Sequence, residues 1–309
     1  MLVPTRSTRR MAVLTSACFG ALLLMPMTGG SATAAPELRD RVDYVALGDS
    51  FAAAPGVPSQ VHQACARSSR NYPSLTAARL TARLTDVTCS GATTADLAVS
   101  RHGEPAQFDA LNRGTDLVTV TIGGNDGVGF SKVLKTCGEL SNSQPAGAPC
   151  REHFTEGGRD RLLEGINETA PKVDTVLDAV HRVAPRAKVL IVGYPSLFPH
   201  DGIGCASSSA PFAAGDFPYL RDTTIRLNAM LAERAVRKGA TYVDTYTPSI
   251  GHDMCQPAER RWIEDLAPRT AAAPAHPNAR GEAAMAEAVT RALAKCRSHA
   301  KDSPVHHAA

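Results

Sequence analysis

The sequence predicts an α/β fold in which helices cover both faces of a parallel sheet. Segments with the pattern of strands alternate with segments of helical periodicity along most of the chain. This alternation is typical of parallel sheets with helices on either side. Several strand segments are nearly continuous apolar runs, as expected of strands that are buried on both faces.

The first half of the chain holds three expected strands and one expected helix. Residues 42–47 form an apolar run that stops at a Gly-Asp-Ser turn. Residues 72–84 carry apolar side chains at helical spacing, and Pro73 lies in the first turn, where a missing N–H is tolerated. A short strand is expected at 86–89, and the β-branched run at 116–122 predicts a fully buried strand.

The second half continues the same alternation. Residues 159–183 place apolar side chains on one side of a long helix, and 188–192 read as a buried strand. A helix is expected at 219–238, a strand at 241–245 and a closing helix at 279–294. In open parallel sheets, ligands bind beyond the carboxyl ends of the strands, so a site is expected in the loops that follow them.

The two ends of the chain are expected to lie outside the folded domain, which we place at residues 35–296. Residues 1–34 combine arginines, an apolar stretch and a small-residue ending, the layout of a secretory signal peptide. General secretion is favoured over twin-arginine export, because Ala12 stands where a bulky residue would help. Pro26 interrupts the apolar stretch, so no stable membrane anchor is expected. Residues 297–309 are polar and aperiodic and predict a flexible tail.

The charge of the mature chain argues against polyanionic partners. The whole sequence has 33 Lys and Arg against 30 Asp and Glu, and three of the arginines precede residue 35. The remaining chain is formally neutral, so nothing favours binding to nucleic acid or anionic membranes. We expect a secreted monomer.

The cysteines predict disulfides rather than a metal site. Seven cysteines follow residue 34, and an exported protein meets an oxidising environment. Six cysteines allow 15 connectivities, and sequence alone does not choose among them. The simplest pairing joins Cys65 to Cys89, Cys137 to Cys150 and Cys205 to Cys255. Cys296 is then left unpaired, and no ligand spacing typical of zinc is present.

Four short motifs supply the side chains that acyl transfer requires. GDSF at 48–51, CSGATT at 89–94 and IGGND at 122–126 each follow an expected strand, and AHPNARG at 275–281 precedes the last helix. In acyl transfer a hydroxyl attacks, an imidazole accepts its proton, and N–H donors stabilise the oxyanion.

In this order, the motifs resemble the blocks of the GDSL/SGNH hydrolase family. Ser50, Gly91, Asn125 and His276 stand at the four positions of that name. The cysteine spacing and GHDMC at 251–255 look most like secreted actinobacterial lipases and esterases of this family. The resemblance implies a three-layer α/β/α sandwich around a mostly parallel, five-stranded, flavodoxin-like sheet. It also implies ester hydrolysis without cofactor or metal, with Ser50 as nucleophile and with oxyanion donors at Ser50, Gly91 and Asn125.

One position departs from the family pattern. The family usually has Asp three residues before the catalytic His, but here that residue is Ala273. Either a distant acid, with Asp253 and Asp265 as candidates, or a backbone carbonyl of Ala273 or Pro274 would then orient the imidazole. We expect a Ser–His dyad oriented by a carbonyl, which fixes the imidazole tautomer but stabilises the imidazolium less than a carboxylate does.

Each candidate also has a structural alternative. Ser50 could be a helix N-cap, a position that serine favours. Gly91 and Asn125 could be turn residues. His252 is a rival base, although we interpret it as a loop residue at the pocket rim.

These observations predict a secreted serine esterase or lipase that acts on small-molecule or lipid esters. Alternatives on the same site are a carbohydrate deacetylase, a thioesterase and a phospholipase, because a fold does not fix the substrate. A non-catalytic cell-envelope binding protein is the alternative from another class. Low aromatic content and the small residues of 206–218 indicate an open cleft and favour short or water-soluble acyl esters.

Overall fold

The computed structural model describes residues 41–207 and 209–302, with side chains described up to residue 295. The expected signal peptide at 1–34 and the last seven residues lie outside this part, and the domain limits remain predictions. Within the described part, none of the helices combines the length and the apolarity that a membrane span requires.

A five-stranded parallel sheet forms the centre of the protein. Its strands are β1 (Asp43–Gly48), β4 (Arg83–Asp86), β5 (Leu117–Thr121), β6 (Lys188–Val192) and β7 (Thr241–Val243). They lie in the order β4-β1-β5-β6-β7, and all neighbouring pairs are parallel. This is the flavodoxin-like strand order, which reverses direction beside β1. The predicted α/β fold is confirmed.

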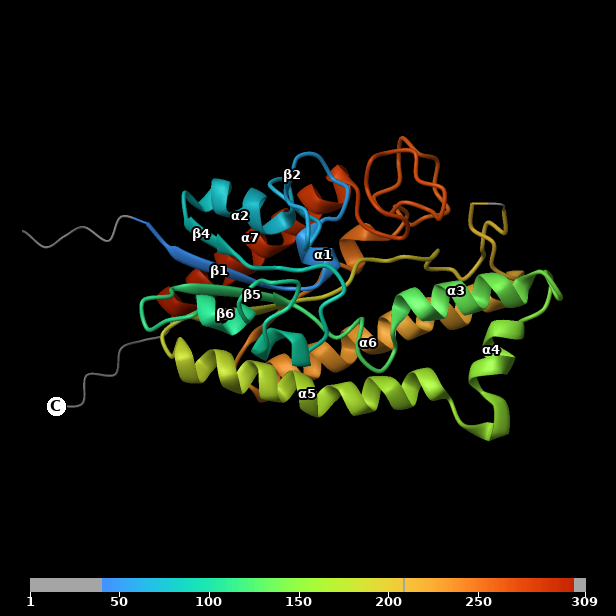
Figure 1. Cartoon of the computed structure of the whole chain (residues 1–309), viewed down its shortest axis with the longest axis horizontal. Coiled ribbons are helices and arrows are strands. Elements are labelled where there is room, and N and C mark those ends of the chain that lie inside the picture. Colours follow the sequence, from blue (N-terminus) through green and yellow to red (C-terminus); the bar gives the residue numbers. More distant parts are fainter. Residues whose placement is uncertain (1–40, 208, 303–309) are drawn as a thin grey trace, which may run out of the picture. The chain divides into compact units, whose positions relative to one another are not determined.

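Helices cover both faces of the sheet, as Figure 1 shows. On one side lie α2 (Tyr72–Leu80) and α7 (Ala279–Asp302), and on the other lie α5 (Arg161–Val183) and α6 (Phe217–Arg237). The remaining elements are α1 (Ser50–Ala53), the hairpin strands β2 (Gln60–His62) and β3 (Arg67–Ser68), α3 (Phe130–Ser141), α4 (Pro149–Phe154), and five short 3₁₀ helices at 95–98, 107–110, 156–158, 214–216 and 247–249.

Alternate residues of β1 enter two separate cores. Tyr44 and Ala46 pack with apolar side chains of α2 and α7, whereas Val45 and Leu47 pack with those of α5 and α6. All four β1 side chains are at most 4 % exposed. The central strand is therefore buried on both faces, which explains why its sequence is a continuous apolar run.

Three elements have a boundary that differs from the expected one by three or more residues, whereas the others differ by at most two. Helix α2 ends at Leu80, because Thr81 takes a left-handed backbone with φ of 53°. This early end lets β4 begin at Arg83, whose N–H donates to Val42, and the expected strand at 86–89 is thus placed too late. At the other end, α7 runs to Asp302, into the segment where a tail was expected, since no proline interrupts the chain before Pro304.

Three disulfides connect loops and helix ends. They join Cys65 to Cys89, Cys137 to Cys150 and Cys205 to Cys255. These are the pairs that sequence neighbours would make. The second one ties α3 to α4, two helices that the strand and helix patterns did not predict.

Candidate active site

Ser50 lies two residues after the end of β1, at the carboxyl edge of the sheet. The turn before it requires glycine, because Gly48 has φ of 146° and a Cβ there would lie 2.5 Å from the carbonyl oxygen of Thr121. Asp49 caps α1, and its Oδ1 accepts a hydrogen bond of 2.9 Å from the N–H of Phe51. Ser50 is thus the first helical residue and not the cap, so the capping alternative is wrong.

A glutamine that the motifs did not reveal holds this turn in place. The N–H of Gly48 donates to Oε1 of Gln107 at 2.8 Å, and Nε2 of Gln107 donates back to the Gly48 carbonyl at 3.0 Å. Gln107 is buried and lies in a 3₁₀ helix far along the chain. No local pattern marks such a contact, because its partner is main chain 59 residues away.

His276 lies against Ser50. Its Nε2 is 2.7 Å from the Ser50 Oγ, and its Nδ1 is 2.8 Å from the carbonyl oxygen of Pro274. A carbonyl can only accept, so Nδ1 carries the hydrogen and Nε2 is free to accept the serine proton. Burial lowers the pKa of His276, an effect that the Pro274 hydrogen bond partly opposes. The imidazole is therefore poised as a neutral base.

Neither acid considered from the sequence contacts this imidazole. Asp253 accepts hydrogen bonds from the N–H of Cys255 and from Gln256. Asp265 pairs with Arg261 at 2.5 Å and accepts the N–H of Ala267. Within residues 41–302, the polar atom that meets Nδ1 is a main-chain carbonyl.

The rival base, His252, is engaged elsewhere. Its ring stacks on Trp262, with ring centroids 3.9 Å apart and planes parallel within 1°. Its Nδ1 lies 2.7 Å from the carbonyl oxygen of Arg260. His252 therefore stabilises its own loop, in agreement with its interpretation as a loop residue.

Gly91 and Asn125 lie on loops that are tied to each other. Gly91 has a left-handed φ of 75°. The N–H of Cys89 donates to the Gly48 carbonyl, which places the start of the Gly91 loop beside the Ser50 turn. The Asn125 side chain donates one hydrogen to the Ala92 carbonyl at 3.0 Å and keeps a second one.

Asp126 joins the same two loops from the other direction. The hydroxyl of Thr94 donates to Asp126 Oδ1 at 2.5 Å, and the N–H of Thr94 donates to Oδ2 at 3.1 Å. These hydrogen bonds fix the position of the loop after β4 relative to the loop after β5.

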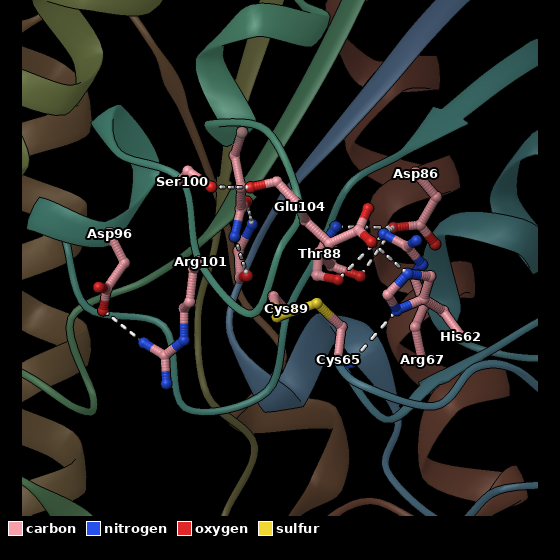
Figure 2. The surroundings of a disulfide bond; sticks show 12 residues. His62, Cys65, Arg67, Asp86, Thr88, Cys89, Asp96, Ser100, Arg101 and Glu104 are labelled. Atoms are coloured by element: carbon pink, nitrogen blue, oxygen red, sulfur yellow. Dashed lines mark hydrogen bonds and ion pairs between the residues drawn. A yellow bond between two sulfur atoms is a disulfide. The ribbon is translucent and has the colours of Figure 1, made fainter.

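The disulfide between Cys65 and Cys89, shown in Figure 2, lies at the start of the loop that contains Gly91. Arg101 pairs with Asp96 at 2.5 Å, and its Nη2 would lie 3.1 Å from a Cβ at Gly91. The disulfide and Arg101 also line a cavity of about 230 Å³. The Gly91 loop is therefore supported by a covalent bond and by a partly buried ion pair.

A smaller cavity has both Ser50 and His276 in its wall. Its volume is about 50 Å³. Most of its lining is apolar and includes Phe130, Leu134 and Leu197. Space beside the serine hydroxyl is thus small and apolar. Among residues 41–207 and 209–295, whose side chains the structure describes, no group of three or more His, Cys, Asp or Glu side chains is arranged to hold a metal ion.

Comparison with known proteins decides the family. Residues 46–284 match the GDSL-like Lipase/Acylhydrolase family, and this range contains all four motif residues. The chain belongs to this family. Its family members hydrolyse esters, and this GDSL-like lipase/acylhydrolase is accordingly a carboxylic-ester hydrolase.

Several Streptomyces enzymes are similar in sequence to this GDSL-like hydrolase. Lipase 2 of Streptomyces coelicolor is 41 % identical over 290 residues, covering 92 % of this chain and 97 % of the relative. A lipase of Streptomyces rimosus is 34 % identical over 258 residues, covering 81 % and 88 %.

Two solved structures resemble it over nearly their whole length. The extracellular lipase of Streptomyces rimosus has a TM-score of 0.68 at 29 % identity, covering 81 % of this chain and 99 % of that one. Phospholipase A1 of Streptomyces albidoflavus NA297 has a TM-score of 0.67 at 26 % identity, covering 82 % and 99 %.

Proposed function

We propose that this GDSL-like hydrolase uses a Ser–His dyad without a catalytic carboxylate. In this mechanism Nε2 of His276 takes the hydroxyl proton as Ser50 attacks the ester carbonyl, and the imidazolium then gives that proton to the departing alcohol. Water hydrolyses the acyl-enzyme by the same steps in reverse. The observation that carries the proposal is the 2.7 Å contact between Nε2 and Oγ, with Nδ1 held by the Pro274 carbonyl.

The oxyanion donors in this proposal are the N–H groups of Ser50 and Gly91 and the side-chain amide of Asn125. In the described part of the chain, neither N–H has a protein acceptor, and the Asn125 amide has one hydrogen to spare. Removing one such donor costs on the order of 3 kcal/mol of transition-state stabilisation. The alanine at position 273 does not by itself favour a non-catalytic protein, because the Pro274 carbonyl supplies the acceptor for Nδ1 that an aspartate would otherwise supply.

For substrate, we propose esters of short acyl chains. The cavity beside Ser50 is apolar and only about 50 Å³ in volume, which suits an acyl group of a few carbons. Comparing p-nitrophenyl acetate, butyrate and palmitate with phosphatidylcholine tests this point. Higher kcat/KM for palmitate or phosphatidylcholine than for butyrate would instead favour a lipase or phospholipase specificity, the latter being the activity named for the Streptomyces albidoflavus structure.

We also propose that the enzyme is exported through residues 1–34. Three disulfides support an oxidising destination, and one similar structure is described as an extracellular lipase. Mass spectrometry of the secreted protein tests this, with the mature N-terminus expected at residue 35.

A fluorophosphonate probe tests the nucleophile. We expect covalent labelling of the wild type and none of Ser50→Ala, since the probe reacts with an activated serine. Equal labelling of both proteins would overturn the mechanism.

A further inference from the structure

We propose that Tyr194 is a positioning residue for the ester hydrolysis, because its hydroxyl joins the nucleophile turn to the oxyanion loop. The inference rests on the proposed function, in which these two segments supply Ser50 and Asn125. The hydroxyl of Tyr194 donates to Oδ2 of Asp49 at 2.5 Å and accepts the N–H of Gly124 at 2.8 Å. Asp49 precedes Ser50 in the chain, and Gly124 precedes Asn125.

Tyr194 itself is held rigidly. Its side chain is fully buried. Its main-chain N–H and carbonyl both pair with the side-chain amide of Asn228, at 2.8 Å each. Its ring meets Phe51 edge to face, with centroids 5.0 Å apart. A side chain fixed at its backbone and at its ring can transmit position to what its hydroxyl binds.

Gly124 packs tightly against the side chain of Tyr194. A Cβ at this residue would lie 3.0 Å from both the hydroxyl oxygen and the nearest ring carbon of Tyr194. The peptide that precedes Asn125 therefore lies directly on the tyrosine. Since a misplacement of about 1 Å can cost on the order of 100-fold in rate, this contact bears on the oxyanion donor.

The direction of the hydrogen bonds depends on the charge of Asp49. An ionised Asp49 accepts from Tyr194, which leaves the tyrosine oxygen free to accept from Gly124. A protonated Asp49 would compete to donate to that same oxygen. Burial raises the pKa of Asp49 to about 7, while the Tyr194 hydroxyl and the Phe51 N–H oppose the rise, and the nearby charge of Asp126 adds to it.

The test compares Tyr194→Phe with Tyr44→Phe. Tyr44 is a matched control, because it is also buried and its hydroxyl is also hydrogen-bonded inside the core, to Thr119 at 2.7 Å. We expect Tyr194→Phe to lower kcat for p-nitrophenyl butyrate about 10- to 100-fold with KM within twofold. The control should retain kcat within threefold, with a similar loss of thermal stability.

The pH profile adds a readout that a merely structural role would not move. Without the tyrosine donor the ionised form of Asp49 is less favoured, so the acid limb of kcat/KM should shift to higher pH in Tyr194→Phe and stay in place in Tyr44→Phe. If Tyr194→Phe does not fold, Asp49→Asn provides a second test of the same hydrogen bond. Its amide oxygen can still accept from the Phe51 N–H, but its amide nitrogen cannot accept from the Tyr194 hydroxyl. Its kcat should therefore fall by a similar factor.

Two outcomes would overturn the inference. One is a Tyr194→Phe enzyme with wild-type kcat and an unmoved acid limb. The other is an equal loss of kcat in Tyr44→Phe. Ser50→Ala separates this failure from that of the proposed function: if Ser50→Ala retains activity, the dyad itself is wrong, whatever Tyr194 does.

Discussion

The two halves of the proposed dyad are held by different kinds of structure. Ser50 lies at the end of a central strand, and its turn is fixed by Gln107 and by main-chain contacts with β5. His276 lies at the end of a long segment between β7 and α7, in which the regular structure is one 3₁₀ turn at 247–249. The sheet positions the first residue, but it does not reach the second.

A buried polar cluster replaces the sheet on the histidine side. Arg261 pairs with Glu264 at 2.7 Å and with Asp265 at 2.5 Å, and all three side chains are at most 8 % exposed. The N–H of Glu264 donates to the His276 carbonyl, and Asn278 donates to the Glu264 carboxylate. Position is thus held by secondary structure on one side and by ion pairs on the other. Substitutions and pH changes should therefore affect the Ser50 side and the His276 side differently.

The largest expected effect comes from removing the base. His276→Ala should lower kcat about 10⁴- to 10⁶-fold, because the serine then lacks its proton acceptor. His252→Ala is the matched control, since His252 lies on the same segment and binds its own loop. Steady-state kinetics with p-nitrophenyl butyrate measures both. Comparable losses in the two variants would contradict the assignment of His276.

The next effect concerns stability on the histidine side. Arg261→Met leaves two buried carboxylates without their cation, which should reduce the free energy of unfolding by about 3–5 kcal/mol. Arg159→Met breaks the exposed pair with Glu164 and should leave the free energy of unfolding nearly unchanged. Urea denaturation monitored by circular dichroism compares them. Equal midpoints would show that the cluster does not hold this segment.

The two sides should also respond oppositely to pH. Burial alone would raise the pKa of Glu264, but hydrogen bonds from Asn278 and Arg269 and the charge of Arg261 lower it overall, so its contribution is lost as pH falls below about 4.5. Asp49 behaves in the opposite way, because burial raises its pKa to about 7. Its contribution to stability is therefore lost as pH rises from about 4 to 7.

Melting temperatures across this range test the contrast. Glu264→Gln should be least stable relative to wild type above pH 5 and approach it below pH 4. The melting temperature of Asp49→Asn should increase relative to that of the wild type as pH rises toward 7. Parallel curves for the two variants would argue against the difference between the two sides.

The smallest effect is expected at Asp253. Because a main-chain carbonyl meets Nδ1 of His276, Asp253→Asn should lower kcat less than about threefold. A loss of several hundredfold would instead identify a catalytic triad. The same criterion applies to Asp265→Asn once its loss of stability has been measured separately.

The sequence predicted the sheet side of the molecule better than the rest. Strands such as β6 are marked by apolar runs, and residues 188–192 were placed correctly because local pattern and burial coincide there. The same holds for the three motifs after strands, since the fold itself brings strand ends together.

What the sequence could not predict depends on contacts between distant residues. Gln107 and Tyr194 act through hydrogen bonds to main chain or to residues more than 50 positions away. Helix α3 was missed although its residues are amphipathic, and the end of α2 depended on a left-handed threonine. The motif at 275–281 located His276, but the choice between the Ala273 and Pro274 carbonyls required coordinates.

The carbonyl of Pro274 has a consequence for genetics. Every amino acid brings the same oxygen, so no exchange of the side chain at position 274 deletes the group that orients the imidazole. A saturation library would report this position as tolerant or as a folding defect, never as part of the reaction. Only a change to the peptide linkage itself, such as an ester in place of the amide between residues 274 and 275, would weaken that acceptor directly.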